Sequence, residues 1–454
     1  MDRISGLSDE LLVKILLLVP TKVAVSTSIL SKRWEYLWMW LPKLDYGQGR
    51  SHQGLKLYLY YESLTPVKIV SGSATDYGHS YCSEPESSRL RRFLDHNLPL
   101  HRAPVIESFR LELVSSRFKR TSIKMWVAIA VSHCLREMKI LYESKLNILP
   151  SNLFTCKSLV ILKLAGGMLL NVPRMVSLPS LKTLKLQRVK YFKGKTLQRL
   201  LSNCPVLEDL VLDLPKGEST GKLTVVVPSL QRLSLDIPSA HDIVGYVIKT
   251  PDLKYFKLVD DNDKSHYCLI EHMPNLSEAH LDVALPDIKS IIGSITSVRR
   301  LAICSAYCVQ AMFDEGFVLN QLEHLKVCVC RDHSSNQIFR LLKSSTILQE
   351  LNLFSMEVSL LDHFPQFMDN WNEPSTVPEC LLSSLQSLNW SLYGGEPQER
   401  DIVIYILEHA VHLKTATIES SEGQFSKFEM LQELALSSRA STTCKLMFEC
   451  PFEL

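Results

Sequence analysis

The chain repeats one spacing of apolar positions over most of its length. In this frame, L-x-x-L-x-L, an apolar residue is followed by two others three and five positions later. Nine successive units begin at Leu159, Leu181, Leu207, Leu230, Leu253, Leu276, Val298, Leu322 and Leu348. The eight steps between the first and the last average about 24 residues. Weaker units begin at Ile106, Leu135, Leu385 and Leu413. Thirteen units therefore fit the frame.

The frame predicts a short strand in each unit. Apolar residues two apart lie on one face of a strand, and the residue between them, such as Lys163 or Lys185, points outward. A proline precedes five of the units, where a missing N–H costs no ladder bond. One strand cannot bury its apolar face alone, so neighbours stack and the chain returns on the other side, for instance as a helix over residues 197–204. A period of 20 to 29 residues is typical of leucine-rich repeats.

The fold class predicted is therefore an α/β solenoid, an irregular leucine-rich-repeat array with a parallel sheet and return helices. The alternative, nine amphipathic helices that share the spacing by chance, does not explain the constant period or the repeated proline. The pattern indicates a stiff surface for a macromolecular partner, and it does not name that partner.

Residues 1–45 carry a helical pattern instead. Ser8 is placed as an N-cap, with Asp9 and Glu10 in the first turn, and an apolar helix follows up to Val19 before Pro20 ends it. A short helix begins at Thr21, and a third helix is expected over residues 28–38. The first helix is apolar nearly all round, more than its own small module requires, which predicts a helical partner.

A second change of pattern comes at the C-terminal end. The order there is strand 385–390, helix 398–410, strand 413–418, helix 428–436 and strand 444–448. This βαβαβ unit has larger return helices than the repeats. We expect it to cap the open end of the sheet, which would otherwise expose unpaired backbone and apolar surface.

Composition narrows the class of protein. Lys+Arg 50 and Asp+Glu 48 give a net charge of +2, so no wide basic field is available for nucleic acid. No segment has the pattern of a signal peptide or the length of a membrane span, so we expect an intracellular protein, cytoplasmic and/or nuclear, with its 12 cysteines as reduced thiols. The excess residue is leucine, 74 of 454, and the frame accounts for its position.

Candidate chemistry is sparse. Cys328, Cys330 and His333 lie close together but in a strand frame without a second ligand pair, and Cys304 with Cys308 follows a strand at a repeat turn. His409 and His412 fall at a helix end, where a role toward the helix dipole is expected. No phosphate-loop, nucleophile-elbow or zinc-protease motif occurs. We expect no enzyme activity, no cofactor and no metal.

The N-terminal module resembles an F-box of the type found in plant F-box/leucine-rich-repeat proteins. The residues that carry the resemblance are Asp2, Arg3, Ile4, Ser5, Leu7, Asp9, Glu10, Leu11, Leu12, Ile15, Leu16, Val19, Pro20, Thr21, Lys22, Ala24, Val25, Thr27, Ser28, Leu30, Ser31, Lys32, Arg33, Trp34, Leu37 and Trp38. Ser8 departs from the family pattern, which normally has proline there; it removes one apolar contact and keeps a competent cap.

The resemblance implies a docking surface for a Skp-family adaptor, which ties the chain to a cullin-RING ubiquitin ligase. The residues assigned to that surface are Leu7, Ser8, Leu11, Leu12, Ile15, Leu16, Val19, Pro20, Leu30 and Trp34. The resemblance further implies that the repeats hold a target protein for ubiquitination. The balanced charge and the lack of a long apolar segment argue against contact with nucleic acid or membrane. A leucine-rich-repeat scaffold outside any ligase, with residues 1–45 as a plain helical cap, is the alternative.

Two further segments are similar to parts of the same family. Residues 93–111 resemble the stretch that opens the repeats, and residues 377–385 with 405–414 resemble the FBD domain that closes them. The expected domains are an F-box module at 1–45, an irregular loop or insert at 46–88, leucine-rich repeats at 89–376 and an FBD-like cap at 377–454. The insert has no counterpart in the family pattern.

Overall fold

The computed structural model of the chain describes residues 4, 6–47, 84–113, 118–144, 146–191, 195–262, 264, 266–283, 289–304, 318–328, 335–354, 373–420 and 427–449. They fall into two compact units, Met1–Thr220 and Gly221–Leu454. In both units the apolar frames form the strands of a parallel sheet, as the sequence predicts. In one representative strand Leu162 and Leu164 are buried, and Lys163 between them is partly exposed. The leucine excess is therefore the repeated core.

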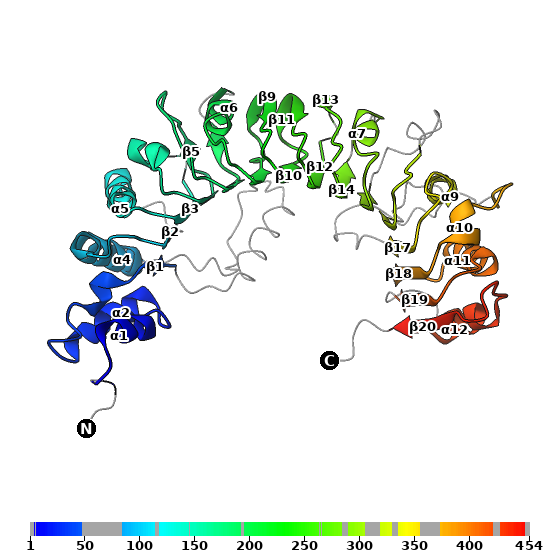
Figure 1. Cartoon of the computed structure of the whole chain (residues 1–454), viewed down its shortest axis with the longest axis horizontal. Coiled ribbons are helices and arrows are strands. Elements are labelled where there is room, and N and C mark those ends of the chain that lie inside the picture. The colour runs from blue at the N-terminus through cyan, green and yellow to red at the C-terminus, as the bar shows by residue number, and fades with distance from the viewer. Residues whose placement is uncertain are drawn as a thin grey trace, which may run out of the picture. The chain divides into compact units, whose positions relative to one another are not determined.

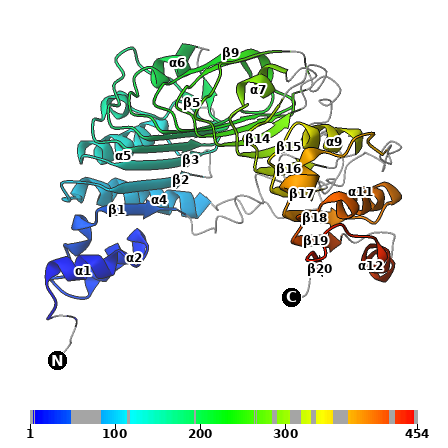
Figure 2. The ribbon, with the colours of Figure 1, turned by 45° about the vertical axis from the view of Figure 1, so that its right-hand side comes forward.

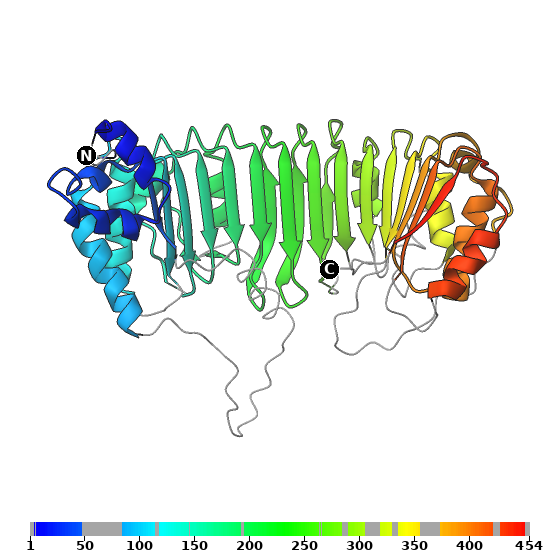
Figure 3. The ribbon, with the colours of Figure 1, turned by 90° about the horizontal axis from the view of Figure 1, so that it is seen from below.

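The sheet of unit 1 follows the chain order β1-β2-β3-β4-β6-β8, with every neighbouring pair parallel. Its strands are β1 (Lys43–Tyr46), β2 (Ser108–Leu113), β3 (Glu137–Tyr142), β4 (Ile161–Ala165), β6 (Thr183–Gln187) and β8 (Asp209–Asp213). Figure 3 shows these strands, in blue to green, running in one direction. Five of the six lie on predicted frames, and β1 is an addition.

Helices cover one face of this sheet (Figure 1). They are α4 (Glu84–Asn97), α5 (Arg120–Ser132), the 3-10 turns η3 (Leu98–Leu100) and η4 (Ser151–Thr155), and α6 (Lys195–Leu201). Helix α6 confirms the return helix expected near residues 197–204. Two short strands, β5 (Leu169–Leu170) and β7 (Lys190–Tyr191), pair beside them. Helix α4 begins inside the range expected to be an irregular insert, whereas residues 48–83 of that insert lie outside the described residues.

Unit 2 continues the same frame in the order β10-β12-β14-β15-β16-β17-β18-β19-β20, again parallel between neighbours. Its strands are β10 (Arg232–Ile237), β12 (Tyr255–Asp260), β14 (Glu278–Val283), β15 (Arg300–Cys304), β16 (His324–Cys328), β17 (Glu350–Phe354), β18 (Ser387–Tyr393), β19 (Thr415–Ser420) and β20 (Lys445–Glu449). The predicted frames beginning at Leu230 through Leu413 all lie on these strands.

The return segments of unit 2 differ in part from the expected helices. The first returns are strands, β11 (Asp242–Lys249) and β13 (Tyr267–Ile270), which form a three-stranded sheet with β9 (Ser219–Val226) in the order β13-β11-β9. The expectation of return helices is wrong for these repeats, because β11 is rich in β-branched residues that favour a strand. Later returns are the helices α7 (Lys289–Ser294), α9 (Ser335–Lys343) and α10 (Glu379–Ser383).

The C-terminal βαβαβ order is confirmed. It consists of β18, α11 (Pro397–His409), β19, α12 (Lys427–Leu436) and β20. Helix α11 starts with a reciprocal capping box between Glu396 and Glu399. Each described boundary falls within about three residues of the range expected from the sequence.

The cysteines depart from the expected reduced thiols at one pair. Cys304 and Cys328 form a disulfide with a Cα–Cα distance of 4.9 Å, and their sequence separation of 24 equals one repeat period. They end two neighbouring strands, so the stacking itself brings them together. The other cysteines that the structure describes form no disulfide, and Cys156, Cys204 and Cys380 are buried as expected of core thiols. Cys308, Cys330 and His333 lie outside the described residues.

Candidate functional site

The N-terminal module is a small helical unit within unit 1. It comprises α1 (Asp9–Leu16), α2 (Thr21–Ser26) and the 3-10 turns η1 (Thr27–Ile29) and η2 (Leu37–Trp40). Figure 2 shows α1 and α2 side by side near β1. The third α-helix expected over residues 28–38 is not formed, because bonds over three residues, such as Met39 N–H to Tyr36 O at 3.1 Å, tighten the chain into turns.

Helix α1 has one buried and one exposed apolar side. Leu12 and Leu16 are 0% and 2% exposed and belong to the core of the module. Leu11 and Ile15 are 45% and 39% exposed, and Leu18 just beyond the helix is 84% exposed. We call the exposed large apolar side chains of the module its apolar surface; they are Ile4, Leu11, Ile15, Leu18, Val19, Val23, Ile29, Leu30, Tyr36 and Trp40. Such a density of exposed apolar side chains is typical of a protein interface.

The residues predicted for docking divide between this surface and the core beneath it. Leu11, Ile15, Val19 and Leu30 lie on the apolar surface, and Ser8 and Pro20 are also exposed. Leu7 and Trp34 are partly buried. Leu12 and Leu16 face inward, so in this structure they hold α1 in place rather than offer a contact. The predicted docking residues did not include Ile4, Leu18, Val23, Ile29, Tyr36 or Trp40. The exposure of these side chains depends on how the short helices pack.

The start of α1 is held by an arginine rather than by a cap. Ser8 occupies the N-cap position in an extended conformation, but its side chain makes no capping hydrogen bond. Arg33 Nη2 lies 2.7 Å from Asp9 Oδ1 and also donates to the backbone oxygen of Leu7. The prediction that Ser8 caps the helix through a side-chain hydrogen bond is therefore wrong. Arg33 fixes this end of the helix instead.

The module is joined to the repeats through β1, which the sequence reasoning missed. The signal was present, because Leu41, Leu44 and Tyr46 repeat the apolar frame of the other units. All three are buried, at 1%, 2% and 1% exposed. Tyr46 packs edge-on against Phe93 of α4 and Phe109 of β2, with ring centroids 6.1 Å and 5.9 Å away. The last residues of the helical module are thus also the first strand of the sheet.

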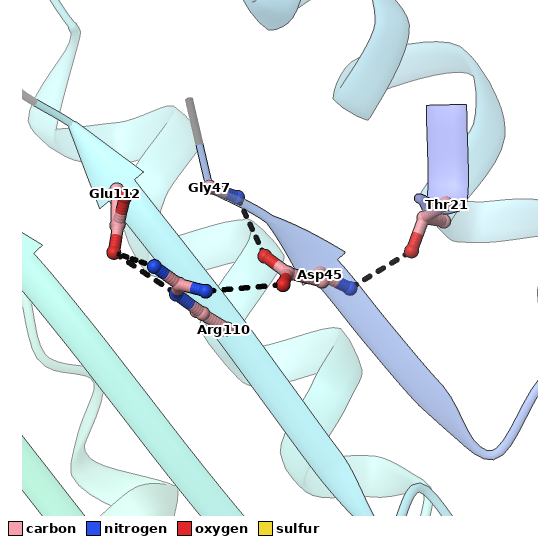
Figure 4. A network of polar contacts seen from close by, with 5 residues as sticks. All are labelled: Thr21, Asp45, Gly47, Arg110 and Glu112. Carbon is pink, nitrogen blue, oxygen red and sulfur yellow. Dashed lines mark hydrogen bonds and ion pairs between the residues drawn. The ribbon is translucent and has the colours of Figure 1, made fainter. Parts of the chain in front are cut away.

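The outward side of β1 carries a polar network (Figure 4). The backbone N–H of Asp45 donates to Thr21 Oγ1 at 2.8 Å, and the N–H of Gly47 donates to Asp45 Oδ1 at 2.8 Å. Arg110 Nη1 donates to Asp45 Oδ2 at 3.2 Å, and its Nε donates to Glu112 Oε1 at 2.9 Å. Burial alone would lower the pKa of Arg110, but the two carboxylates raise it overall. The network links α2, β1 and β2.

Backbone bonds complete the junction. The oxygen of Met39 accepts from the N–H groups of Arg102 and Ala103 at 2.8 Å and 3.1 Å, and the oxygen of Pro42 accepts from Glu107 N–H at 2.7 Å. These partners come from the segment that leads into β2. The module and the first repeat therefore share one hydrogen-bonded boundary.

The described residues contain little that could support other chemistry. Within them, no group of three His, Cys, Asp or Glu side chains is arranged to hold a metal ion. No helix of the described ranges is long and apolar enough to cross a membrane. His409 ends α11, where its Nδ1 lies 2.9 Å from the oxygen of Tyr405 and its ring stacks on the Tyr405 ring at 4.2 Å. That placement accords with a local role at the helix end.

Comparison with known proteins matches three family descriptions along the chain. The F-box domain matches residues 4–46, the leucine-rich repeats of "FBD-associated F-box protein At5g56370" match residues 123–279, and FBD matches residues 373–418. Among curated relatives, FBD-associated F-box protein At4g10400 of Arabidopsis thaliana is 56% identical over 451 residues, 99% of this chain and 100% of the relative. FBD-associated F-box protein At5g38590 of the same plant is 47% identical, covering 96% of this chain and 98% of the relative.

Fold and site together define a leucine-rich-repeat protein with an N-terminal F-box module. The chain belongs to the family of FBD-associated F-box proteins. F-box proteins with leucine-rich repeats generally act as substrate receptors of Skp–cullin–F-box ubiquitin ligases, and they are typically non-catalytic subunits.

Proposed function

We propose that this chain is the substrate receptor of a Skp–cullin–F-box ubiquitin ligase, with the F-box docking on a Skp-family adaptor and the repeats binding a target protein. The observation that carries the proposal is the apolar surface of the module. Its α1 residues Leu11 and Ile15 remain exposed although the core beneath them is complete. Burying such side chains in an interface contributes roughly 1.5–3 kcal/mol each.

The adaptor contact is assigned to Leu11, Ile15, Val19 and Leu30, flanked by Leu7, Ser8, Pro20 and Trp34. Leu12 and Leu16 support it from within. Ser8 stands where the family pattern has proline, and the Arg33–Asp9 pair holds the start of α1. The repeats, residues 89–376, and the C-terminal cap, residues 377–454, are proposed to present the target from the cytoplasm and/or nucleus.

The proposed mechanism is proximity. A shared boundary between docking module and repeats keeps a bound target at a set position relative to the ligase core, which raises the effective concentration of its lysines near the charged ubiquitin carrier. No side chain of this chain has to take part in the transfer. The network of Thr21, Asp45 and Arg110 supports this, because it joins α2 to β2 through β1.

Co-purification of the full chain with a Skp-family adaptor tests the proposal. Ile15→Asp and Leu30→Asp should abolish adaptor binding, whereas Met175→Asp, at a position 82% exposed outside the module, should retain it. Leu16→Asp is unsuitable because Leu16 is 2% exposed and the variant would disrupt the module core. An adaptor that never binds, or that binds both module variants as well as the control, would favour the scaffold alternative.

Target identification follows from the same variants. The Ile15→Asp chain should capture a target on its repeats without passing it to the ligase, so the target should accumulate relative to the unmodified chain. Equal target levels with both chains would contradict a receptor role even if the adaptor binds.

A further inference from the structure

The face of the unit 1 sheet that faces away from the helices carries a row of basic side chains. Strand register pairs Arg110 with Lys139, Lys139 with Lys163, and Lys163 with Lys185. These four residues lie side by side on β2, β3, β4 and β6, about 4.8 Å apart from strand to strand. All four are partly exposed. Figure 3 looks onto this face, where the four strands run from cyan to blue-green.

The four basic side chains differ in whether they form ion pairs. Arg110 is engaged by Asp45 and Glu112, and Lys163 Nζ lies 2.8 Å from Glu137 Oε1. Among the residues that the structure describes, neither Lys139 nor Lys185 forms an ion pair. We call Lys139, Lys163 and Lys185 the lysine row. It is bounded by Arg110 on one side and by Val211, its register partner on β8, on the other.

Lys139 lies between two other basic side chains, Arg110 on β2 and Lys163 on β4. Burial lowers the pKa of Lys139, and the positive charges of Arg110 and Lys163 on the neighbouring strands lower it further, while Glu112 and Asp45 oppose this shift. An anion placed over the row would relieve this repulsion. The positions that flank Lys163 on β4 are the uncharged Ile161 and Ala165, whereas Glu137 flanks Lys139 on β3 and pairs with Lys163.

The geometry favours a narrow, linear ligand with carboxylates. The lysine row spans about 10 Å across three strands, and an extended peptide places alternate side chains about 7 Å apart on one face, so two acidic residues reach over it. Glu112 and Glu137 border the row and repel a broad polyanion such as nucleic acid. The guanidinium of Arg110, which would favour phosphate by bidentate bonding, is already occupied.

We propose that the lysine row is a docking site for an extended segment of a partner protein that carries acidic residues at alternate positions. The proposal deepens the proposed function, since it takes the partner to be the target held by the repeats and names its recognised chemistry. It does not depend on the adaptor, because the row is separate from the apolar surface of the F-box module.

A peptide-binding titration of the full chain tests the site. The probe is a fluorescent peptide that alternates Glu and Thr, and its counterpart has Gln in place of Glu. The affinity for the Glu peptide should fall as the salt concentration is raised. The Gln peptide should bind at least about tenfold more weakly than the Glu peptide. The double variant Lys139→Gln/Lys185→Gln should weaken Glu-peptide binding about tenfold.

The matched control removes the same charge elsewhere. Lys157 and Lys195 are exposed and lie outside the sheet face, so Lys157→Gln/Lys195→Gln should change the affinity by less than about twofold. Equal losses in both double variants, or equal binding of the Glu and Gln peptides, would overturn the site. Tighter binding of a phosphoserine peptide than of the Glu peptide would overturn the carboxylate assignment.

Two further measurements separate the possible failures. Unchanged thermal unfolding of the lysine variants confirms that the sheet is intact. The Ile15→Asp chain should bind the Glu peptide as the parent does, whether or not the parent binds an adaptor. A parent chain that binds the Glu peptide but no adaptor would therefore contradict the ligase proposal alone. A parent chain that binds an adaptor but not the Glu peptide would contradict the lysine row alone.

Discussion

The Oγ1 of Thr21 accepts a hydrogen bond of 2.8 Å from the backbone N–H of Asp45. Thr21 opens α2, and Asp45 lies within β1, so this bond joins the F-box module to the first strand of the repeat sheet. Thr21 is only 3% exposed, so water does not readily replace the bond while the junction is closed.

Replacing Thr21 by Val should therefore loosen the junction. The change keeps the side-chain shape but leaves the Asp45 N–H without its acceptor, which costs roughly 1–3 kcal/mol. Hydrogen exchange should show faster exchange of the Asp45 amide and an earlier opening of β1. Ser26→Ala in the same helix, where the exposed hydroxyl donates to Val23 O, should leave that amide protected. Equal exchange in both variants would contradict the role of Thr21.

Removal of the ion pairs of Arg110 should lower the free energy of unfolding more than removal of an exposed ion pair nearby. Arg110→Met leaves the buried Glu112 without its ion pair and removes the pair with the exposed Asp45, and we expect a loss of roughly 1–3 kcal/mol in the free energy of unfolding. Lys182→Met breaks a pair with Glu208 in which both side chains are exposed, and it should cost less than about 1 kcal/mol. Urea unfolding of the two variants makes the comparison.

His101 predicts a loss of stability in mild acid. It is 6% exposed, and burial, aided by the neighbouring His133, lowers its pKa from 6.5 to about 4. The unfolded chain takes up the proton first, so the contribution of His101 is present above pH 6.5 and is lost as pH falls toward 4. The loss is on the order of 3 kcal/mol. The urea midpoint of the parent chain should fall as the pH falls from 6.5 to 4. This dependence on pH should be weaker in His101→Gln and unchanged in His96→Gln, because His96 is exposed.

The buried Glu399 predicts the opposite dependence of stability on pH. It is 7% exposed, and burial raises its pKa to about 7 although the N–H groups of Gly394 and Glu396 donate to its carboxylate. Its contribution is present below pH 4.5 and is lost as pH rises toward 7, by an amount on the order of 3 kcal/mol. Glu399→Gln should remove this loss between about pH 5 and 8, whereas Glu408→Gln, exposed on the same helix, should not. Parallel pH profiles for all three chains would contradict the assignment.

Gly245 should be intolerant of any side chain. A Cβ at this position would lie 2.4 Å from the backbone oxygen of Tyr267 and 2.6 Å from its ring. Gly245→Ala must displace β13 from β11, and we expect a loss of about 1–3 kcal/mol in thermal or urea unfolding. A Cβ at Gly293 in α7 would meet no described atom within 4 Å, so Gly293→Ala should be neutral or stabilise by up to about 1 kcal/mol.

The strands were predictable because their signal is local. Leu162 and Leu164 alternate with Lys163, and the same spacing recurs every 24 residues or so, which leaves few other folds. The strand β1 carries the same frame at Leu41, but the preceding helical pattern concealed it. The prediction of a third helix in the module was wrong for a related reason, because tertiary contacts decide the conformation of a short segment more than its helical periodicity does.

The candidate sites depended on contacts that no local pattern contains. An apolar helix such as α1 does not reveal that Leu12 faces the core while Leu11 remains exposed, because that choice is made by the segments packed against it. The sequence also shows Lys139, Lys163 and Lys185 only as isolated outward residues. Their alignment in one row is a matter of register between strands.

By itself the sequence determined the repeat period, the positions of the strands from β2 to β19 that carry the apolar frame, the C-terminal βαβαβ order and the resemblance of residues 1–45 to an F-box. These follow from spacings within about 24 residues, which the chain displays directly. Tertiary structure alone decided that Thr21 binds Asp45, that Cys304 meets Cys328, and which basic side chains share a face. Those outcomes depend on stacking and register, which bring together residues a full repeat or more apart.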